Sequence, residues 1–372
     1  SAGIEVIVAS AKPGPAAASR FTSFLQTPNL YDNAPAWAEA MRAFGQEQDI
    51  PPVLIATEDA GLLVLDRYHD MLGAYFMRPH PSPGVVTEIL DKRQLYLHAE
   101  RLGIGVPKNR ELTSADGLDG LDPTGVLIKP SCRYYLDDKG RIRSFRLETG
   151  ATKAIGGSPA AAARIVLGAG FPALLQEAIP GGFENLVTIA LSLSRDGRVM
   201  DHMTSCKEYE YPEPFGDGLI VRARHDPGLL QSTVELLKSF GYWGICDVEF
   251  KFDPKTKTYK VLDANPRPWL WLNLATRQGK SLLLHAYNQT TGLRVRRPRQ
   301  VEKPTEWVSP RGSMAFLGRC YSPSRHGALL PARLIAGSLS TSYGNWRSFR
   351  DPLYLAPSSW RRLASHYLRG PR

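Results

Sequence analysis

The feature that most constrains this chain is a pair of short segments, 244–252 and 259–263, which both have the pattern of buried strands joined by a tight turn. Side chains alternate along a strand, so Asp247 and Glu249 point to the same face of the first segment. The apolar residues beside them indicate that the strand is buried, and buried acids need a partner that compensates their charge. We therefore expect this hairpin to gather charged side chains on one face of a sheet.

The second strand continues into Asp263-Ala264-Asn265-Pro266-Arg267, where the polar residues again alternate with other residues. If the two strands pair as a hairpin, three carboxylates and one amide oxygen converge. Such oxygen ligands suit Mg²⁺, which binds few carboxylates together with phosphate oxygens. Like charges at this density repel one another unless a cation lies between them. The alternative is a solvated hairpin face that carries scattered acids.

Two further segments point to a nucleotide. Lys129 ends the apolar strand 126–128, where its ammonium can reach a phosphate as a compact charge, although strand ends often carry lysine for no such reason. Residues 174–179 form an apolar strand that runs into Pro180-Gly181-Gly182. That break exposes backbone groups able to contact an adenine edge, or it is an ordinary exit from a strand.

In this order and spacing, the segments resemble the ATP-grasp superfamily over about residues 4–292. The resemblance implies ATP binding, with the phosphates, the adenine and the ribose held by Lys92, Lys129, Gln176, Glu177, Ile179 and Glu184. It implies that two Mg²⁺ ions, with Mn²⁺ as an alternative, are held by Glu249, Asp263 and Asn265. Arg267 then contacts the substrate.

Within the superfamily, the chain looks most similar to carboxylate–amine ligases of the D-aspartate ligase and predicted carboligase type. In those proteins a basic residue, a Tyr-Pro pair and glycines follow the central hairpin, and Lys207, Tyr211-Pro212, Gly216 and Gly218 match this pattern loosely. Arg222 and Arg224 alternate just beyond it and share a face. Arg222, Arg267 and Lys207 are the predicted catalytic residues, and Arg222 is the one expected to hold a substrate carboxylate. The alternative for Arg222 is an exposed position on a surface strand.

Two departures from the family pattern affect these expectations. The loop after the phosphate lysine is usually rich in glycine and serine, but here it begins Ser131-Cys132-Arg133-Tyr134-Tyr135, so we expect a longer cover with its tip at 149–153. The N-terminal domain of the family normally begins with one more strand and a glycine-rich turn. This chain opens almost directly in a strand, Ile4–Ala9, which predicts a truncated domain.

The implied reaction is ATP-dependent ligation of a small-molecule carboxylate to an amine through an acyl phosphate, with release of ADP and phosphate. No cysteine or serine nucleophile is required. A phosphotransferase on the same fold is one alternative, and a nucleotide-binding module without chemistry is another. An intact Glu249, Asp263 and Asn265 set argues against the second alternative but not against the first.

The predicted fold is α/β, an ATP-grasp fold preceded by a doubly wound domain and followed by a basic C-terminal extension. The predicted boundaries are an N-terminal domain at 1–85, an ATP-grasp domain of two α+β subdomains at 86–292, and the extension at 293–372. Strands are expected at 52–57, 126–129, 172–176, 184–195 and 198–208, helices at 35–47, 159–168 and 227–240, and a loop between the first strand and the first helix.

Charge and cysteine content limit the possible partners and the cellular compartment of the protein. Residues 294–372 hold 15 Lys and Arg against three acids, a net charge of +12, which leaves the first 293 residues near neutrality at −2. Arginine beside tryptophan, as at 346–350 and 360–362, suits an anionic surface or polymer. We favour instead an appendage that packs on the core or forms a homodimer, and we consider nucleic acid an unlikely partner because no recognition motif accompanies the charge. Four scattered cysteines without a CxxC pair predict reduced thiols in a cytoplasm.

Overall fold

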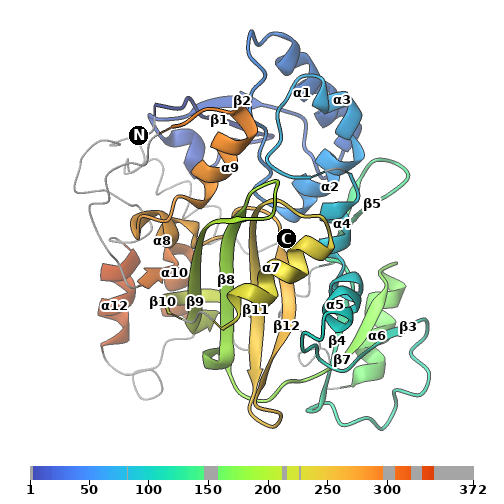
Figure 1. Ribbon diagram of the computed structural model, residues 1–372. Helices are drawn as coiled ribbons and strands as arrows, with labels where there is room; N and C mark the ends of the chain where they lie inside the picture. The colour runs from blue at the N-terminus through green and yellow to red at the C-terminus, as the bar shows by residue number, and fades with distance from the viewer. Residues whose placement is uncertain are drawn as a thin grey trace.

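A computed structural model describes residues 3–81, 83–145, 158–211, 216–225, 228–295, 306–319 and 329–338. It has a mixed α/β architecture with a six-stranded sheet at its centre, a three-stranded sheet beside it and an N-terminal layer above (Figure 1). Among the described helices, none is both long and apolar enough to cross a membrane.

The N-terminal layer is an α/β unit built on two parallel strands. Its elements are β1 (Ile7–Ser10), η1 (Pro15–Ala18), β2 (Ser23–Gln26), α1 (Ala34–Gln46), α2 (Asp59–Arg67) and α3 (His69–Gly73). The apolar faces of α1 and α2 form its core, which also takes in Tyr134 and Ile142 from a hairpin of β5 (Tyr134–Leu136) and β6 (Ile142–Ser144). A segment from the middle of the chain therefore completes the N-terminal unit.

Two details of this unit differ from the sequence prediction. The strand predicted at 52–57 is reduced to a single bridge between Val53 and Met77, because Pro51 and Pro52 have no N–H to donate to a ladder. β2 occupies a segment that was predicted to be a loop. The first strand and the first helix are confirmed with boundaries shifted by up to three residues.

The three-stranded sheet has the order β3-β7-β4, and its central strand β7 is antiparallel to both neighbours. Its strands are β3 (Asn109–Leu112), β4 (Val126–Pro130) and β7 (Ala173–Glu177), and α6 (Pro159–Gly168) covers one face. The small alanine side chains of α6 allow it to pack closely on the strands. The predicted strands at 126–129 and 172–176 and the predicted helix at 159–168 are confirmed, whereas β3 was not predicted.

The central sheet has the order β12-β11-β8-β9-β10-β13, and every neighbouring pair is antiparallel. Its strands are β8 (Leu186–Leu193), β9 (Val199–Tyr211), β10 (Asp217–Arg224), β11 (Gly244–Asp253), β12 (Thr258–Asn265) and β13 (Glu306–Val308). The predicted hairpin of β8 and β9 is confirmed, and so is the pairing of β11 with β12. The short helix η3 (Phe183–Asn185) leads into β8.

The two faces of this sheet differ in character. On one face Cys246, Val248 and Phe250 pack under the helices α4 (Val85–Leu90), α5 (Lys92–Arg101) and α7 (Leu230–Ser239). On the other face Ile245 packs with α8 (Leu272–Arg277) and α9 (Leu282–Thr291), and the following residues that point the same way are Asp247 and Glu249. This second face therefore changes from apolar to charged along β11.

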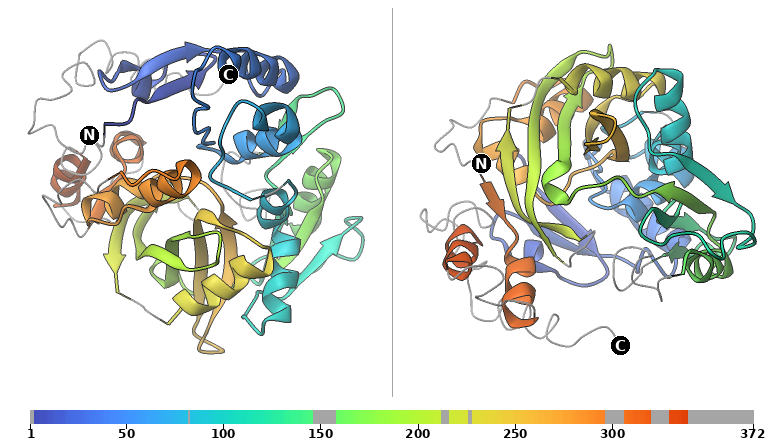
Figure 2. Two further views of the ribbon diagram at one scale, coloured as in Figure 1. Left: turned by 45° about the horizontal axis from the view of Figure 1, so that its top comes forward. Right: turned by 90° about the horizontal axis from the view of Figure 1, so that it is seen from below.

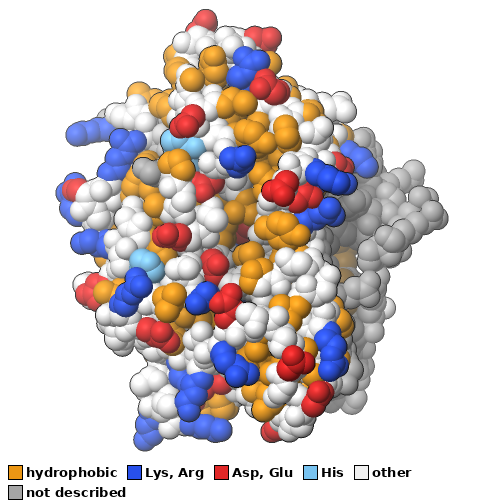
Figure 3. Space-filling view, turned by 90° about the vertical axis from the view of Figure 1, so that its right-hand side faces the viewer, with side chains coloured by type: hydrophobic (Ala, Val, Ile, Leu, Met, Phe, Trp, Pro, Cys, Tyr) orange, Lys and Arg blue, Asp and Glu red, His pale blue; other side chains and the backbone are white. Residues whose placement is uncertain are grey.

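The described part of the C-terminal extension packs on the edge of the central sheet, opposite the three-stranded sheet (Figure 2). β13 extends the sheet at β10, and α10 (Pro310–Arg319) and α12 (Leu330–Gly337) bury Phe316 and Leu334 against it. Arg296, Arg297 and Arg299 and the segments 346–350 and 360–362 lie outside the described residues. On the face drawn in Figure 3, acidic and basic side chains of the described residues are intermixed rather than grouped by sign.

Candidate functional site

The β11–β12 hairpin brings the predicted acidic residues together. Cα partners across the hairpin are Glu249 with Asp263 and Asp247 with Asn265, so all four lie in two adjacent rows on the charged face. Residues that face each other across an antiparallel pair have side chains within contact range. Glu249 and Asp263 are thus direct neighbours across the hairpin, and Asn265 is the next residue of β12 on the same face.

Lysine side chains compensate both carboxylates. Lys92 Nζ lies 2.9 Å from Asp263 Oδ1, and Lys207 Nζ lies 3.1 Å from Glu249 Oε2. Burial raises the pKa of Asp263, but the Lys92 and Lys129 ammonium groups and the Ala264 N–H together outweigh burial and the net shift is downward. Burial lowers the pKa of Lys92 and Lys207, but the nearby carboxylates together outweigh it and the net shifts are upward. Asp263 and both lysines are therefore held in their charged forms.

The geometry brings the predicted metal ligands near one another, and the metal itself stays a prediction. Within the described residues, no three His, Cys, Asp or Glu side chains are grouped so that they could hold a metal ion by themselves. The expected cage of three carboxylates is therefore not formed, and Asp247 lies deeper, with 3% of its surface exposed. Glu249, Asp263 and Asn265 nevertheless fit Mg²⁺, which takes few protein oxygens and completes its shell with phosphate and water.

Lys92 owes its position to the junction of α5 with β4. Asp91 caps α5 by accepting a hydrogen bond from the Arg93 N–H at 2.8 Å, and the Ser131 hydroxyl donates to the same carboxylate. The Lys92 N–H donates to the Ser131 carbonyl at 2.9 Å. These bonds bring the start of α5 to the end of β4, next to Lys129.

Lys129 differs from the other two lysines of the site. The described residues offer it no ion-pair partner within 4 Å. Burial, followed by the Lys92 ammonium, lowers its pKa from 10.5 to about 8. A buried cation without a carboxylate partner is costly, and a bound anion would compensate it.

Arg267 is held by groups from two parts of the chain. Its Nε donates to the Asp59 carboxylate at the start of α2, and Nη2 donates to Asn265 Oδ1 at 3.0 Å. Nη1 donates to the Pro268 carbonyl at 3.1 Å. Burial lowers the pKa of Arg267, but Asp59, Asp247 and Asp263 together outweigh it and the net shift is upward. No pattern in the sequence identified Asp59, which is 208 residues from Arg267 along the chain.

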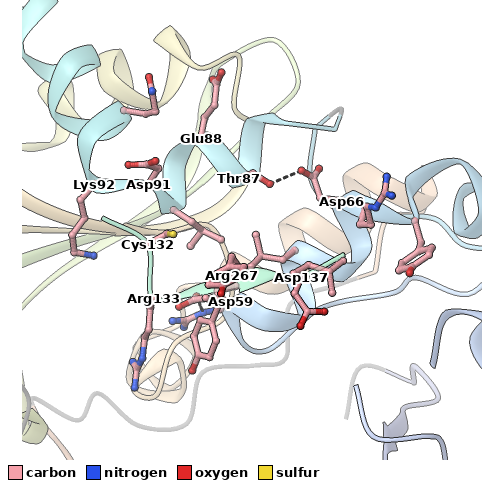
Figure 4. A pocket seen from close by; sticks show the side chains of 18 of the residues that line it. Asp59, Asp66, Thr87, Glu88, Asp91, Lys92, Cys132, Arg133, Asp137 and Arg267 are labelled. Atoms are coloured by element: carbon pink, nitrogen blue, oxygen red, sulfur yellow. Dashed lines mark hydrogen bonds and ion pairs between the residues drawn. The ribbon is translucent and has the colours of Figure 1, made fainter. Parts of the chain in front are cut away.

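A pocket of about 940 Å³ opens beside these groups. Its walls are α2, the turn between α4 and α5, the segment 132–140 and the end of β12 (Figure 4). Asp59 and Arg267 lie side by side, and Lys92 projects from another wall. Asp263, Asn265 and Arg267 all line this cavity, so the charged face of the hairpin is accessible from it.

The predicted adenine hinge is anchored by its own side chains. Gln176 Oε1 accepts a hydrogen bond from the Tyr96 hydroxyl at 3.0 Å, and Glu177 pairs with Lys260. Ile179 is buried, with 7% of its surface exposed. Glu184 is exposed and accepts a hydrogen bond from the Gly182 N–H at 2.9 Å. The tip predicted at 149–153 and Pro212 lie outside the described residues.

Arg222 is not brought to this cluster. Lys207 is the Cα partner of Val221, so Arg222 projects from the opposite face of the sheet to Lys207 and Glu249. There its Nη2 lies 2.8 Å from Glu208 Oε2, which also pairs with Arg333 of α12. Arg222 and Arg224 share a face as predicted, but that face is not the one that carries the hairpin acids.

The two sheets, with strands β11 and β12 and the lysine-bearing strand β4 facing a common site, form an ATP-grasp-like fold. No family model matches the sequence. The D-aspartate ligase of Enterococcus faecium (strain Aus0004) is 23% identical over 258 residues, which cover 64% of this chain and 59% of that protein. The chain is similar in sequence to this ligase and spans less than two thirds of its length.

Solved structures agree with this fold. A Staphylococcus aureus N5-carboxyaminoimidazole synthetase complexed with ADP has a TM-score of 0.58 at 13% identity, with 86% of this chain and 79% of that chain covered. An L-amino acid ligase from Bacillus licheniformis has a TM-score of 0.51 at 13% identity, with 76% of this chain and 64% of that chain covered. At such identities the likeness concerns the fold.

Proposed function

We propose that the chain is an ATP-dependent ligase that joins a small-molecule carboxylate to an amine through an acyl phosphate and releases ADP and phosphate. One observation carries the proposal. Lys92, Asp263 and Arg267 line one pocket, Glu249 lies opposite Asp263 in the hairpin, and Lys129 is close enough to Lys92 and to both carboxylates to interact with their charges. The ligase relative supports the same reaction class.

The nucleotide is proposed to lie with its phosphates at Lys92 and Lys129. The side chains of Gln176 and Glu177 are engaged by Tyr96 and Lys260, so we assign the adenine contact to the backbone around Ile179 and to its buried side chain. Glu184 is assigned to the ribose, because a carboxylate accepts hydrogen bonds from hydroxyl groups. That contact requires Glu184 to exchange its bond with the Gly182 N–H.

Glu249, Asp263 and Asn265 are the residues that would hold Mg²⁺. Magnesium neutralises the charge that develops on phosphate oxygens during phosphoryl transfer. Lys92 and Lys207 hold the same two carboxylates in its absence.

The reaction then follows from the positions of the cationic side chains. An oxygen of the substrate carboxylate attacks the γ-phosphorus of ATP, and ADP leaves with the electron pair of the broken bond. Lys129 and Arg267 stabilise the oxygens of the transferred phosphoryl group. The amine attacks the acyl carbon, phosphate leaves with its electron pair, and the amine loses a proton to solvent. The pocket is within the size range that buries a drug-sized ligand, so both acceptor substrates can enter it.

The test is a product analysis with ATP, Mg²⁺ and a panel of carboxylic acids, each with and without an amine. Hydroxylamine serves as a general amine, because it converts an acyl phosphate to a hydroxamate, which forms a coloured complex with ferric ion. The proposal expects ADP, phosphate and a hydroxamate together. A stable phosphorylated acid without free phosphate would identify a phosphotransferase, and nucleotide binding without turnover over the whole panel would identify a binding module.

A further inference from the structure

The contact between Asp59 and Arg267 joins the N-terminal unit to the hairpin that carries the reaction groups. Both side chains are largely buried, with 12% of the Asp59 and 18% of the Arg267 side-chain surface exposed. Both line the pocket (Figure 4). A buried, hydrogen-bonded ion pair fixes the direction of a guanidinium more tightly than a surface pair does.

The hydrogen bonds of Arg267 leave a defined part of it available. A guanidinium has five N–H groups. The described residues accept three of them, at Nε, Nη1 and Nη2, from Asp59, Pro268 and Asn265. One N–H on each terminal nitrogen remains for an anionic ligand, and two such donors match the two oxygens of a carboxylate or phosphoryl group.

Asp59 belongs to a helix that is packed into the N-terminal core. It lies in the first turn of α2, where the helix N-terminus stabilises a negative charge. The same helix buries Ala60, Val64 and Leu65 in the N-terminal core. Asp59 can therefore hold Arg267 in place without moving itself.

We propose that Asp59 is a positioning residue for the reaction, through which the N-terminal unit aims the two remaining N–H groups of Arg267 at the oxygens of the carboxylate and its phosphorylated form. This inference rests on the proposed ligase function for the identity of the anion. Without Asp59, Arg267 would be drawn toward Asp247 and Asp263, which are the other carboxylates that act on its charge. The guanidinium would then compete with Lys92 and turn away from the pocket.

A purely structural ion pair predicts a different behaviour. If the contact only ties two parts of the chain together, its loss lowers stability and affects all ligands alike. If it aims Arg267, its loss lowers kcat and weakens anion binding while ATP binding persists, because the nucleotide is assigned mainly to Lys92, Lys129 and the hinge.

The test compares Asp59→Asn with Glu58→Gln. Glu58 is the neighbouring acid at the start of α2, and its carboxylate accepts a hydrogen bond from the Tyr31 hydroxyl at 2.7 Å without touching Arg267. Asp59→Asn is expected to lower kcat by about 10- to 100-fold, since a displacement of about 1 Å costs that much, with the ATP dissociation constant changed by less than about twofold. Asp59→Glu is expected to recover part of the loss, and Glu58→Gln to match the unaltered protein.

A second measurement keeps this inference separate from the ligase proposal. Titration of the ADP–Mg²⁺ complex with inorganic phosphate reports on Arg267 whatever the substrate proves to be, and Asp59→Asn is expected to weaken phosphate binding about tenfold. Failure of every acid to give a hydroxamate, with this weakening still seen, would overturn the ligase proposal alone. Unchanged phosphate affinity and kcat in Asp59→Asn, or an equal loss of ATP affinity, or no phosphate binding by the unaltered protein, would overturn the positioning role.

Discussion

Replacing Lys129 by methionine is expected to stabilise the nucleotide-free protein and to weaken ATP binding at the same time. Burial and Lys92 lower the pKa of Lys129 from 10.5 to about 8. Each pKa unit corresponds to about 1.4 kcal/mol, so keeping this ammonium charged inside the folded protein at pH 7 costs about 3 kcal/mol. Methionine has a similar length and no charge, so the variant should recover much of that energy.

The sign of the pH dependence follows from the direction of the shift. The folded pKa of Lys129 lies below the unfolded value, so the unaltered protein gains stability as pH rises from about 8 toward 10.5. The Lys129→Met variant lacks this gain. The difference in the free energy of unfolding between the two proteins should therefore shrink steadily as pH rises above 8.

Whereas Lys129→Met is expected to raise the stability of the protein, it is expected to lower its affinity for ATP. A charge-assisted contact to a phosphate contributes about 1.5–3 kcal/mol, so ATP should bind about 10- to 100-fold more weakly to the variant. Bound phosphate also raises the pKa of the lysine, so ATP affinity of the unaltered protein should fall above pH 8, whereas Lys129→Arg should show no such fall because arginine stays charged.

Urea unfolding and calorimetric ATP titrations at pH 7.0 to 9.5 measure both effects. Lys255→Met is the matched control, because Lys255 lies exposed in the turn between β11 and β12. A Lys129→Met protein that is less stable than the unaltered one, and that binds ATP equally well, would refute the assignment of Lys129 as an uncompensated phosphate ligand.

Other predictions concern the metal ligands, a buried histidine and the C-terminal extension. Glu249→Gln is expected to abolish turnover and to lower the free energy of unfolding in urea by about 3 kcal/mol, because Lys207 loses its partner. Adding Lys207→Met should restore the free energy of unfolding but not turnover. Restored turnover in the double variant would contradict the metal assignment. Burial lowers the pKa of His80 to about 4, so its neutral form stabilises the fold above pH 6.5, and this contribution is lost as pH falls toward 4. In His80→Gln the urea midpoint of unfolding should fall less over this pH range. An unchanged dependence of the midpoint on pH would contradict the role of His80. The anionic-surface interpretation of the extension predicts salt-sensitive sedimentation with anionic vesicles that disappears when residues 339–372 are removed; binding that is absent, or unaffected by the removal, would leave the extension as a structural appendage.

Local patterns predicted the centre of the site well. Alternation placed Asp247 with Glu249 on one face of β11 and Asp263 with Asn265 on one face of β12, because the period of two is a property of any strand, and the tight turn between the strands indicated that these faces meet. Lys129 was found for a similar reason, as a charge at the end of an apolar run. Asp59 gave no such signal, since its partner Arg267 lies in a different unit and the contact depends on how two units pack.

The prediction for Arg222 shows where alternation reaches its limit. Lys207 and Arg222 lie on neighbouring strands, and which of them share a face depends on the register between β9 and β10. The pairing is interrupted at Ile220 and then returns to its earlier register, in which Val221 faces Lys207 and Arg222 faces Cys206. Which residues of two strands face each other is set by how the strands pair, and the alternation within each strand does not reveal it. Arg222 therefore falls on the face that packs against α12 through Glu208.

The prediction of a metal began from a sound premise, that acids packed on one buried strand face need a cation. The structure shows that the chain supplies its own cations, since Lys92 and Lys207 occupy the positions beside Asp263 and Glu249. The premise therefore did not by itself require a metal, and the lysines were separated from their acids by 171 and 42 residues, too far for any local pattern to reveal.

The positive charge that remains uncompensated is what points to an external ligand. Two lysines already compensate two carboxylates, so Lys129 adds a positive charge that the described side chains do not neutralise, and a polyphosphate is the ligand that this surplus favours. A metal that arrives with that polyphosphate would replace the lysines at the carboxylates and free both ammonium groups to bind phosphate oxygens. On this reasoning, the free energy of binding metal and nucleotide together should be more favourable than the sum of their separate binding free energies.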